Sequence, residues 1–405
     1  MKILYFHQHF STPKGAAGIR SYAMAQSLIK NGHQVTMVCG SFGNGQTGLT
    51  SSFVNGMRRG EVEGIDIIEF ELSYSNNSTF AQRVSLFLSF AYKSVKVAMT
   101  EKYDVIFATT TPLTASIPGI VAKWLRKKPF VFEVRDLWPE LPKAMGVIKN
   151  PIILWLMSVL EWVSYHSADR LIGLSPGIVD GIVSRGIKRD KVTIIPNGCD
   201  LDIFASQPVA WRPEGIEKTD LMAIFTGTHG LANGLDAVID AALELSNRAI
   251  KDIKIVLIGN GMKKEALQQR ATELKLNNLI FHDPVDKDKL AGLMASADIG
   301  LQTLANIPAF YYGTSPNKFF DYIAAGLPVL NNYPGWLSDL ITDEKCGFTV
   351  TPESPEDFAN ALEKAASDRE SLKIMGKNAQ ELAKRKFDRA LLSQKFNDWV
   401  TGVKS

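Results

Sequence analysis

The chain has 405 residues, of which 45% are hydrophobic and 21% charged, and its formal net charge is +3. This length predicts two domains, the composition excludes wholesale disorder, and so small a charge gives no argument for nucleic-acid binding. The three cysteines, Cys39, Cys199 and Cys346, lack metal-ligand spacing and are predicted to be small buried side chains in a reducing cytosol.

No secretory signal and no membrane-spanning helix are expected. The apolar start of the chain is short and predicts a buried strand, and no uncharged apolar run reaches the ~18 residues that a spanning helix needs. Two segments, 80–99 and 151–163, are apolar and aromatic, and each fits either a core helix or a helix on a membrane surface. A cytoplasmic protein is therefore predicted.

Apolar runs alternate with helical patterns along the first half of the chain. Residues 41–59, rich in Gly, Ser, Thr and Asn, are predicted to form a long polar loop. Near-continuous apolar strands are typical of a parallel sheet covered on both faces. The expected strands are 3–6, 34–39, 105–108, 130–133, 171–174 and 192–195, with a strand pair or hairpin arm at 62–70 and a first helix at 19–30.

The second half repeats this pattern after an irregular, proline-bearing segment that begins near residue 204. We therefore predict an N-terminal domain, 1–205, and a C-terminal domain, 206–386. In the second domain the expected strands are 223–226, 253–258, 279–282, 299–301, 329–330 and 348–350, and the expected helices are 235–249, 263–274, 287–295, 355–367 and 369–385.

The segment Ser315–Val329 carries the most informative pattern. Pro316 fits the first turn of a helix, and Gly326 fits the position just past its end. Lys318 then lies in the first turn, where the helix dipole disfavours a cation unless an anion binds there. Asp321 follows one turn later, where its carboxylate could accept hydrogen bonds from sugar hydroxyls. The alternative is a core helix whose lysine reaches solvent along its aliphatic stem.

A glycine-bearing loop, 11–18, joins the first strand to the first helix, at the corner that faces the ligand crevice of an open α/β sheet. Arg20 lies in the first turn of that helix, again at the end that disfavours a cation; an exposed arginine is the alternative. Later in the chain, Arg135 and Asp136 follow a buried strand. They indicate either a ligand site or a structural ion pair of Arg135 with Asp136 or Glu133.

Three further loops contain glycines that would let the backbone approach a ligand. Residues 227–235 suit a diphosphate, and His229 within them is interpreted as a local hydrogen-bonding residue rather than a catalytic base. The segments 259–261 and 196–198 each form a predicted turn. Each of these signals is weak alone.

Together these segments resemble, in order and spacing, glycosyltransferase family 4, which comprises retaining nucleotide-sugar glycosyltransferases. Ser315–Val329 is similar to the family's S-P-x-K segment, and Ile195–Phe204 is similar to its P-N-G-x-D-x-x-x-F segment. Arg135–Glu140 resembles the R-D-L-W-P-E signature of a subgroup that builds bacterial surface polysaccharides. The resemblance implies an α/β GT-B fold, with two Rossmann-like β/α/β domains facing each other across a cleft. It also implies that the last helix, 387–405, packs back on the first domain.

The resemblance assigns expected roles to individual residues. Catalysis is expected of Lys318, Arg20 and Asp136, with the two cations stabilising the departing diphosphate. Donor binding is expected of Gly227, Thr228, His229, Gly259, Gly261, Ser315, Pro316, Asn317, Lys318 and Asp321. Contact with the acceptor or the cleft is expected of Gly15, Ala16, Ala17, Gly18, Arg135 and Asn197. No metal and no cofactor are expected.

Two departures from the family pattern bear on donor binding. Thr228 and Asn233 stand where most relatives have Arg and Lys, so Lys318, with Lys263 or the arginine of the first helix, would have to balance the diphosphate. Gly313 stands where many relatives have a glutamate that touches the donor sugar. Recognition of that sugar is therefore expected to differ.

The resemblance implies a metal-independent, hexosyltransferase-type enzyme that moves a sugar, expected to be an N-acetylated amino sugar, from a UDP-linked rather than a GDP-linked donor. The expected acceptor is a glycan or a polyprenyl-diphosphate-linked glycan of O-antigen or capsule synthesis. Peripheral contact with the inner membrane is expected through 80–99. Two alternatives stay open: a sugar-nucleotide epimerase of the same two-domain shape, and a non-catalytic nucleotide-binding subunit of a polysaccharide assembly complex.

Overall fold

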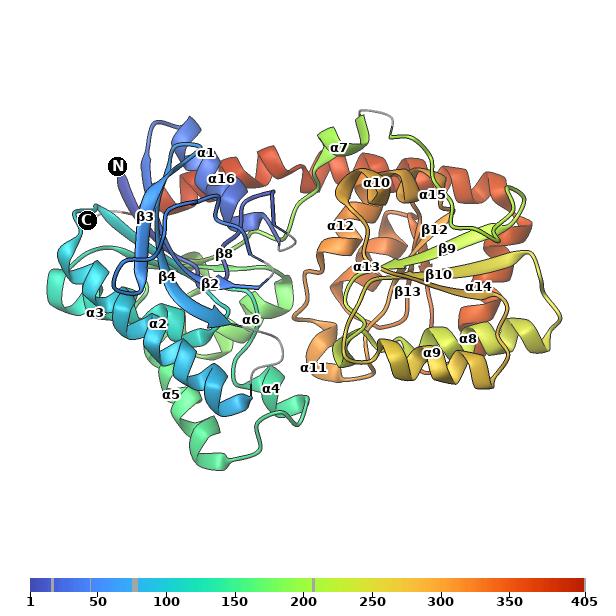
Figure 1. Ribbon diagram of the computed structural model, residues 1–405, viewed down its shortest axis with the longest axis horizontal. Helices are drawn as coiled ribbons and strands as arrows, with labels where there is room; N and C mark the ends of the chain where they lie inside the picture. The colour runs from blue at the N-terminus through green and yellow to red at the C-terminus, as the bar shows by residue number, and fades with distance from the viewer. Residues whose placement is uncertain (16–17, 44, 75–78, 206–207, 404–405) are drawn as a thin grey trace. The chain divides into compact units, whose positions relative to one another are not determined.

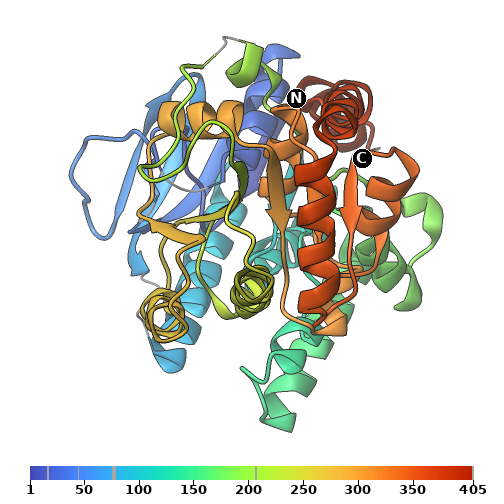
Figure 2. The ribbon, with the colours of Figure 1, turned by 90° about the vertical axis from the view of Figure 1, so that its right-hand side faces the viewer.

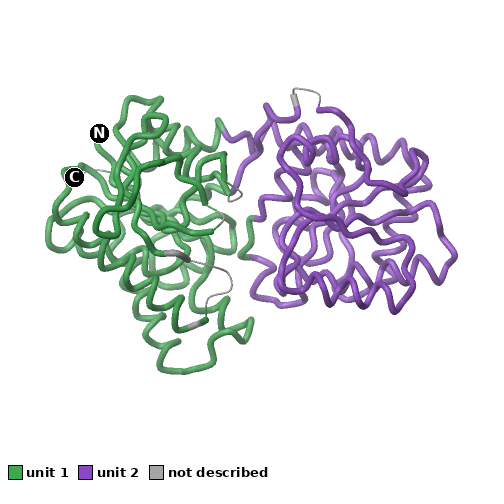
Figure 3. Tube along the Cα trace, in the orientation of Figure 1, with its two compact units in different colours: residues 1–196, 313–315, 390–405 green, residues 197–312, 316–389 purple. Residues whose placement is uncertain are grey.

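The computed structural model describes residues 1–15, 18–43, 45–74, 79–205 and 208–403. Figure 3 colours two compact units. Unit 1 comprises Met1–Pro196, Gly313–Ser315 and Ala390–Ser405, and unit 2 comprises Asn197–Tyr312 and Pro316–Arg389. This grouping places 197–205, predicted as the end of the first domain, in unit 2.

Unit 1 is built on a mainly parallel sheet (Figure 1). Its strands are β1 (Lys2–Phe6), β2 (Gln34–Phe42), β3 (Met57–Val62), β4 (Ile65–Tyr74), β5 (Val105–Thr109), β6 (Phe130–Val134), β7 (Arg170–Gly173) and β8 (Val192–Ile194). Its helices are α1 (Arg20–Lys30), α2 (Phe80–Thr100), α3 (Ile117–Arg126), α4 (Glu140–Ala144), α5 (Pro151–Ser167), α6 (Pro176–Ser184) and α16 (Arg389–Thr401). Among the described residues the strand order is β3-β4-β2-β1-β5-β6-β7-β8, and only β3 and β4 pair antiparallel.

Alternation along β1 explains how both faces of this sheet are covered. Leu4 and Phe6 belong to a core cluster with side chains of α2, α3, α5 and α6. Ile3 and Tyr5 point to the opposite face and belong to a second cluster with side chains of α1 and α16. Because successive strand residues face opposite sides, one apolar strand supplies both layers.

Unit 2 is a fully parallel α/β unit. Its strands are β9 (Leu221–Thr226), β10 (Ile253–Ile258), β11 (Leu279–His282), β12 (Ile299–Gln302), β13 (Val329–Asn331) and β14 (Gly347–Thr349), in the order β11-β10-β9-β12-β13-β14. Its helices are α7 (Leu201–Ala205), α8 (Asp236–Asn247), α9 (Lys264–Glu273), α10 (Lys287–Ser296), α11 (Pro308–Tyr311), α12 (Asn317–Ala324), α13 (Trp336–Asp343), α14 (Pro355–Ser367) and α15 (Arg369–Leu382).

Helices cover both faces of the sheet in unit 2 as well. Figure 1 shows α8, α9 and α14 on one face and α10, α12 and α15 on the other, and Figure 2 shows α8 and α9 end-on. Tyr322 of α12 fixes that helix to the sheet, because its hydroxyl accepts a hydrogen bond from the Thr226 N–H at 3.0 Å. The start of α12 thus lies near the carboxyl end of β9, the edge where open α/β sheets bind ligands.

The predicted polar loop at 41–59 is wrong at both ends. The strand β2 continues to Phe42, and β3 begins at Met57 and pairs with β4 as a hairpin, as predicted for 62–70. The strand β3 has alternating exposed residues and an ion pair from Arg59 to Asp66. A polar edge strand lacks the apolar run that identifies buried strands.

The segments 80–99 and 151–163 lie in α2 and α5, and none of the described helices is long and apolar enough to cross a bilayer.

Candidate functional site

The start of α12 has the features of an anion site. Pro316 is the N-cap residue, with a backbone conformation that precedes a helix, and no side chain caps this helix start. The first turn begins at Asn317, one residue later than Pro316 was expected to begin it. Uncapped N–H groups at a helix start carry partial positive charge and suit an anionic ligand.

Lys318 adds a buried amine to this helix start. Its Nζ donates a 2.7 Å hydrogen bond to Asn233 Oδ1 and lies 4.1 Å from the centre of the Phe225 ring. None of the ion pairs between described residues includes Lys318. Burial lowers the pKa of Lys318 to about 7. The position therefore disfavours the ammonium ion unless an anion arrives to compensate it.

The loop after β9 orients this amine. Asn233 donates from Nδ2 to the Thr228 carbonyl at 2.7 Å, which leaves its Oδ1 to accept from Lys318. Thr303 Oγ1 in turn donates to the Asn233 carbonyl at 2.8 Å. At the loop position where the family resemblance led us to expect a lysine, Asn233 instead accepts a hydrogen bond from the amine of α12.

His229 is buried in the same loop, and neither ring nitrogen has a hydrogen-bond partner among the described residues. Burial, then the charges of Lys264 and Lys318, lower its pKa to about 4, so the ring is neutral at pH 7. Its local hydrogen bonds come from the backbone: the N–H donates to the Asn260 carbonyl, and the carbonyl accepts from the Lys263 N–H. The ring itself has no hydrogen-bonding role in this structure.

Gly259 and Gly261 are required by the contact between two loops. Gly259 has φ +149, and a Cβ there would lie 1.8 Å from the Gly227 carbonyl oxygen. The Gly227 N–H donates to the Ile258 carbonyl at 2.9 Å across the same contact. A Cβ on Gly261 would lie 2.5 Å from the His229 carbonyl oxygen. These glycines therefore have a packing reason independent of any ligand.

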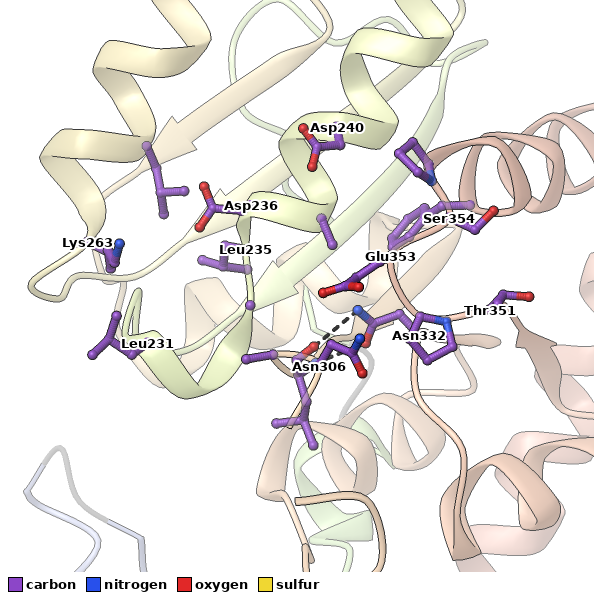
Figure 4. Close-up of a pocket in the computed structure, with 18 of the residues that line it drawn as sticks. Leu231, Leu235, Asp236, Asp240, Lys263, Asn306, Asn332, Thr351, Glu353 and Ser354 are labelled. Atoms are coloured by element: carbon purple, nitrogen blue, oxygen red, sulfur yellow. Dashed lines mark hydrogen bonds between the residues drawn. The ribbon is translucent and has the colours of Figure 1, made fainter. Parts of the chain in front are cut away.

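Lys263 lies in a pocket that contains several carboxylates. It lines a pocket of about 300 Å³ in unit 2 together with Asp236, Asp240 and Glu353 (Figure 4). Asp236 and Asp240 also pair with Arg270. These carboxylates, two of which pair with Arg270, make Lys263 a weaker counter-charge for a diphosphate than Lys318, and its expected role in replacing the missing basic pair stays a prediction.

Asp321 lies in the middle of α12 in a different electrostatic environment. Burial, reinforced by the charge of Asp200, raises its pKa to about 7, against the opposing charges of Arg389 and Lys287. Asp200 itself pairs with Arg389, whose Nη2 lies 3.0 Å from Asp200 Oδ2. The predicted contact between Asp321 and ribose hydroxyls stays a prediction.

Arg20, in unit 1, is engaged by the protein itself. Its guanidinium donates to both carboxylate oxygens of Glu133, with 2.8 Å from Nη2 to Oε2, and to the carbonyls of Ile195 and Pro196. Burial alone would raise the pKa of Glu133, but the charge and hydrogen bonds of Arg20, together with the charge of Arg135 and the Thr109 hydroxyl, hold that pKa below its usual value. Both side chains are almost fully buried. These contacts argue against the expected role of Arg20 at a diphosphate.

Arg135 and Asp136 lie at the carboxyl edge of the unit 1 sheet. The Arg135 backbone N–H donates to Thr110 Oγ1 at 2.8 Å, and its Nη1 lies 3.4 Å from His7 Nε2. Burial raises the pKa of Asp136, against the charge of Arg135. None of the ion pairs between described residues joins Arg135 to Asp136 or Glu133. The structural ion pair that was the alternative to a ligand site is therefore not formed.

His7 and His9 also lie at this edge of the sheet, although no sequence pattern considered above predicted a role for them. Burial lowers the pKa of both rings, to about 4 for His9, and Arg135 adds to the effect. The signal in the sequence was a His-Gln-His triplet directly after the first buried strand.

The remaining residues expected at the site differ in burial and belong to different units. Gly15 is buried, Gly18 is exposed, and Ala16 and Ala17 lie outside the described residues. Asn197 is buried and belongs to unit 2, whereas Ser315 belongs to unit 1. The helix start of α12 and the loop after β9 are therefore the best-defined part of the candidate site.

Comparison with known proteins covers both halves of the chain. The family model described as Glycosyltransferase Family 4 matches residues 17–203, and the model described as Glycosyl transferases group 1 matches residues 209–382. An uncharacterized glycosyltransferase of Methanocaldococcus jannaschii is 22% identical over 365 residues, which cover 87% of this chain and 86% of the relative.

Two solved structures share the fold. The Anabaena protein HepE, solved with UDP and glucose, matches with a TM-score of 0.69 at 17% identity and covers 100% of both chains. WaaG, a glycosyltransferase involved in lipopolysaccharide biosynthesis, matches with a TM-score of 0.70 at 17% identity and covers 99% of this chain and 100% of the other. These similarities confirm the predicted GT-B fold class.

Proposed function

Because the chain belongs to glycosyltransferase family 4 and has the GT-B fold, we propose that it transfers a sugar, with retention of configuration, from a UDP-sugar to a lipid-linked glycan acceptor. The UDP in the HepE structure and the lipopolysaccharide role of WaaG support this choice of donor and of pathway class. The proposed donor sugar is an N-acetylated amino sugar, and the proposed site of action is the cytoplasmic face of the membrane.

The single observation that carries the proposal is Lys318. A lysine that forms no ion pair with any other described residue, and whose amine is buried at an uncapped helix start, is costly in the free protein. A nucleoside diphosphate would offset that cost, because its oxygens would accept hydrogen bonds from the amine and from the N–H groups of the helix start.

The same groups would act on the leaving group. As the bond between the sugar and the diphosphate breaks, negative charge grows on the departing oxygen, and the ammonium of Lys318 would stabilise it. Attack by the acceptor hydroxyl on the same face of the sugar, with its proton passing to the departing phosphate oxygen, requires no protein nucleophile. This route also needs no metal.

The proposal is tested by nucleotide binding followed by transfer. Calorimetry with UDP, GDP, ADP and TDP should show micromolar binding of UDP to the wild type and its loss in Lys318→Ala, with circular dichroism confirming an intact fold. The UDP-sugars would then be tested for transfer to lipid-linked acceptors.

Each alternative gives a different result. Conversion of a UDP-sugar to its epimer without an acceptor would favour the epimerase, and UDP binding without turnover on any acceptor would favour the binding subunit. Normal transfer by Lys318→Ala would contradict the proposed mechanism.

A further inference from the structure

Unit 1 contains an apolar groove that the proposed chemistry does not use. It has a volume of about 1160 Å³ and is lined by side chains of α2, α5 and the segments around α4, all labelled in Figure 1. Leu88 of α2 and Leu156 of α5 are among its walls, and each is 54% exposed. The described lining includes Arg83 and no aspartate or glutamate.

The helices that form the groove expose more apolar surface than a soluble helix pair normally does. On the same two helices, but outside the groove lining, Tyr92 of α2 and Trp155 and Trp162 of α5 are each more than half exposed. Residues 80–100 of α2 include three basic and no acidic residues. Exposed aromatic and aliphatic side chains on a helix such as α2, whose charged residues are all basic, suit an amphiphile with an anionic head.

One end of the groove meets the polar edge of the unit 1 sheet. His9, Thr111 and Trp138 line that end and follow β1, β5 and β6 in the chain. Arg135 lies at the same edge, three residues before Trp138, and contacts His7. The apolar groove therefore reaches the sheet edge that carries Arg135, for which the family resemblance implies contact with the acceptor or the cleft.

We propose that this groove holds the hydrocarbon chain of the lipid-linked acceptor, with the phosphate or diphosphate of that lipid near Arg83 and Arg135. A concave groove encloses a single chain, whereas the flat face of a bilayer could not fill it. This inference rests on the proposed function and names the substrate class that its acceptor side takes: an isoprenoid-type lipid phosphate.

The test compares the full-length protein with the double variant Leu88→Gln/Leu156→Gln. The probe is geranylgeranyl diphosphate below its micellar concentration, titrated by calorimetry against inorganic diphosphate. Both leucines are half exposed, so the substitutions should leave the fold intact. The variant Leu125→Gln is the matched control, because Leu125 is 69% exposed on α3 and lies outside the groove.

The lipid diphosphate should bind more tightly than inorganic diphosphate, and the double variant should weaken its binding at least about tenfold. Leu125→Gln should leave it unchanged. Equal binding by the double variant would overturn the inference, as would equal affinity for lipid and inorganic diphosphate. Tight binding to neutral phosphatidylcholine vesicles without the lipid diphosphate would overturn it in favour of a bilayer surface.

Two further measurements separate this inference from the proposed function. Lys318→Ala should keep the lipid diphosphate and lose UDP, which excludes binding of the probe at the donor site. If UDP binds but the lipid diphosphate does not, only the inference about the groove fails.

Discussion

The first turns of α1 and α12 present the same local pattern with opposite outcomes. Each follows a strand and a loop, and each places a cation where the helix dipole disfavours one. Arg20 is neutralised by Glu133, a residue 113 positions away, and by two backbone carbonyls. Lys318 has an amide oxygen and an aromatic ring as neighbours, and no carboxylate among the described ion pairs.

From this difference we expect a structural role for Arg20 and a ligand-binding role for Lys318. A buried charge that the protein compensates contributes to the integrity of the fold, and its removal leaves the partner charge stranded. A buried charge that the protein does not compensate costs stability until a ligand arrives. Substitutions at the two positions should therefore act on different properties.

The largest expected effect is on stability, at Arg20. Arg20→Ala should lower the free energy of unfolding of unit 1 by about 3–5 kcal/mol, because it leaves Glu133 buried without its partner. Chemical denaturation followed by tryptophan fluorescence measures this. The double variant Arg20→Ala/Glu133→Gln should recover part of the loss. A folded Arg20→Ala with normal stability and lost UDP binding would instead restore the role that the sequence assigned to Arg20.

The next effect is on donor affinity. Lys318→Asn should raise the dissociation constant for UDP about 10- to 100-fold, the range expected for a lost charge-assisted hydrogen bond. The exchange variant Asn233→Lys/Lys318→Asn should recover part of it, because Nζ of Lys318 lies 2.7 Å from Asn233 Oδ1 and the new lysine can place its amine nearby. Lys263→Ala is the control and should stay within about twofold. Loss of UDP binding in Lys263→Ala would move the donor site to its pocket.

The third effect is the pH dependence of UDP binding. Burial lowers the pKa of Lys318 to about 7 in the free protein, and a bound diphosphate should raise it. Binding then takes up a proton above pH 7, so affinity should fall between pH 7 and 9 by up to about tenfold per unit. Calorimetry in buffers of different ionisation enthalpy measures the proton uptake. The single variant Lys318→Asn should lose this pH dependence of UDP affinity. A wild-type affinity that does not change between pH 7 and 9 would contradict the binding of the diphosphate at Lys318.

The smallest effect is a gain in stability from Lys318→Met, on the order of 1 kcal/mol, since Lys318 as a whole residue is only partly buried. A lysine whose folded pKa is lowered below its unfolded value destabilises most at low pH. The gain should be fully present below pH 7 and should shrink as the pH rises from 7 toward 10.5. Denaturation at pH 6 and pH 9 compares the two. A gain that is the same at both values would show that Lys318 does not titrate as proposed.

Local pattern was sufficient for most of the fold. Strands such as β1 and β9 are continuous apolar runs, and the helices between them have clear ends, so the α/β class follows from short stretches of sequence. The edge strand β3 was not predicted, because its residues are largely polar and it is held in a strand conformation by its pairing with β4.

The candidate site was only partly predictable for the same reason. The helix start and Lys318 follow from the pattern around Pro316, but the pairing of Arg20 with Glu133 joins distant positions that no local rule connects. The contact between Lys318 and Asn233 likewise depends on how α12 packs against the loop after β9. The family resemblance marked Asn233 as a missing cation and named Lys318 among the residues that would compensate, but the hydrogen bond between the two could not be predicted.

The helix α16 has a consequence for how the protein is made. Phe396 and Val400 complete the cluster that contains Tyr5, and Trp399 donates from Nε1 to the Leu171 carbonyl at 3.1 Å. Yet the chain from Asn197 to Tyr312 and from Pro316 to Arg389 belongs to unit 2. A ribosome needs roughly 10 to 40 s to synthesise that stretch. Throughout this interval the apolar face of the first unit that Phe396 and Val400 later cover stays exposed, so we expect chaperones to bind it during translation.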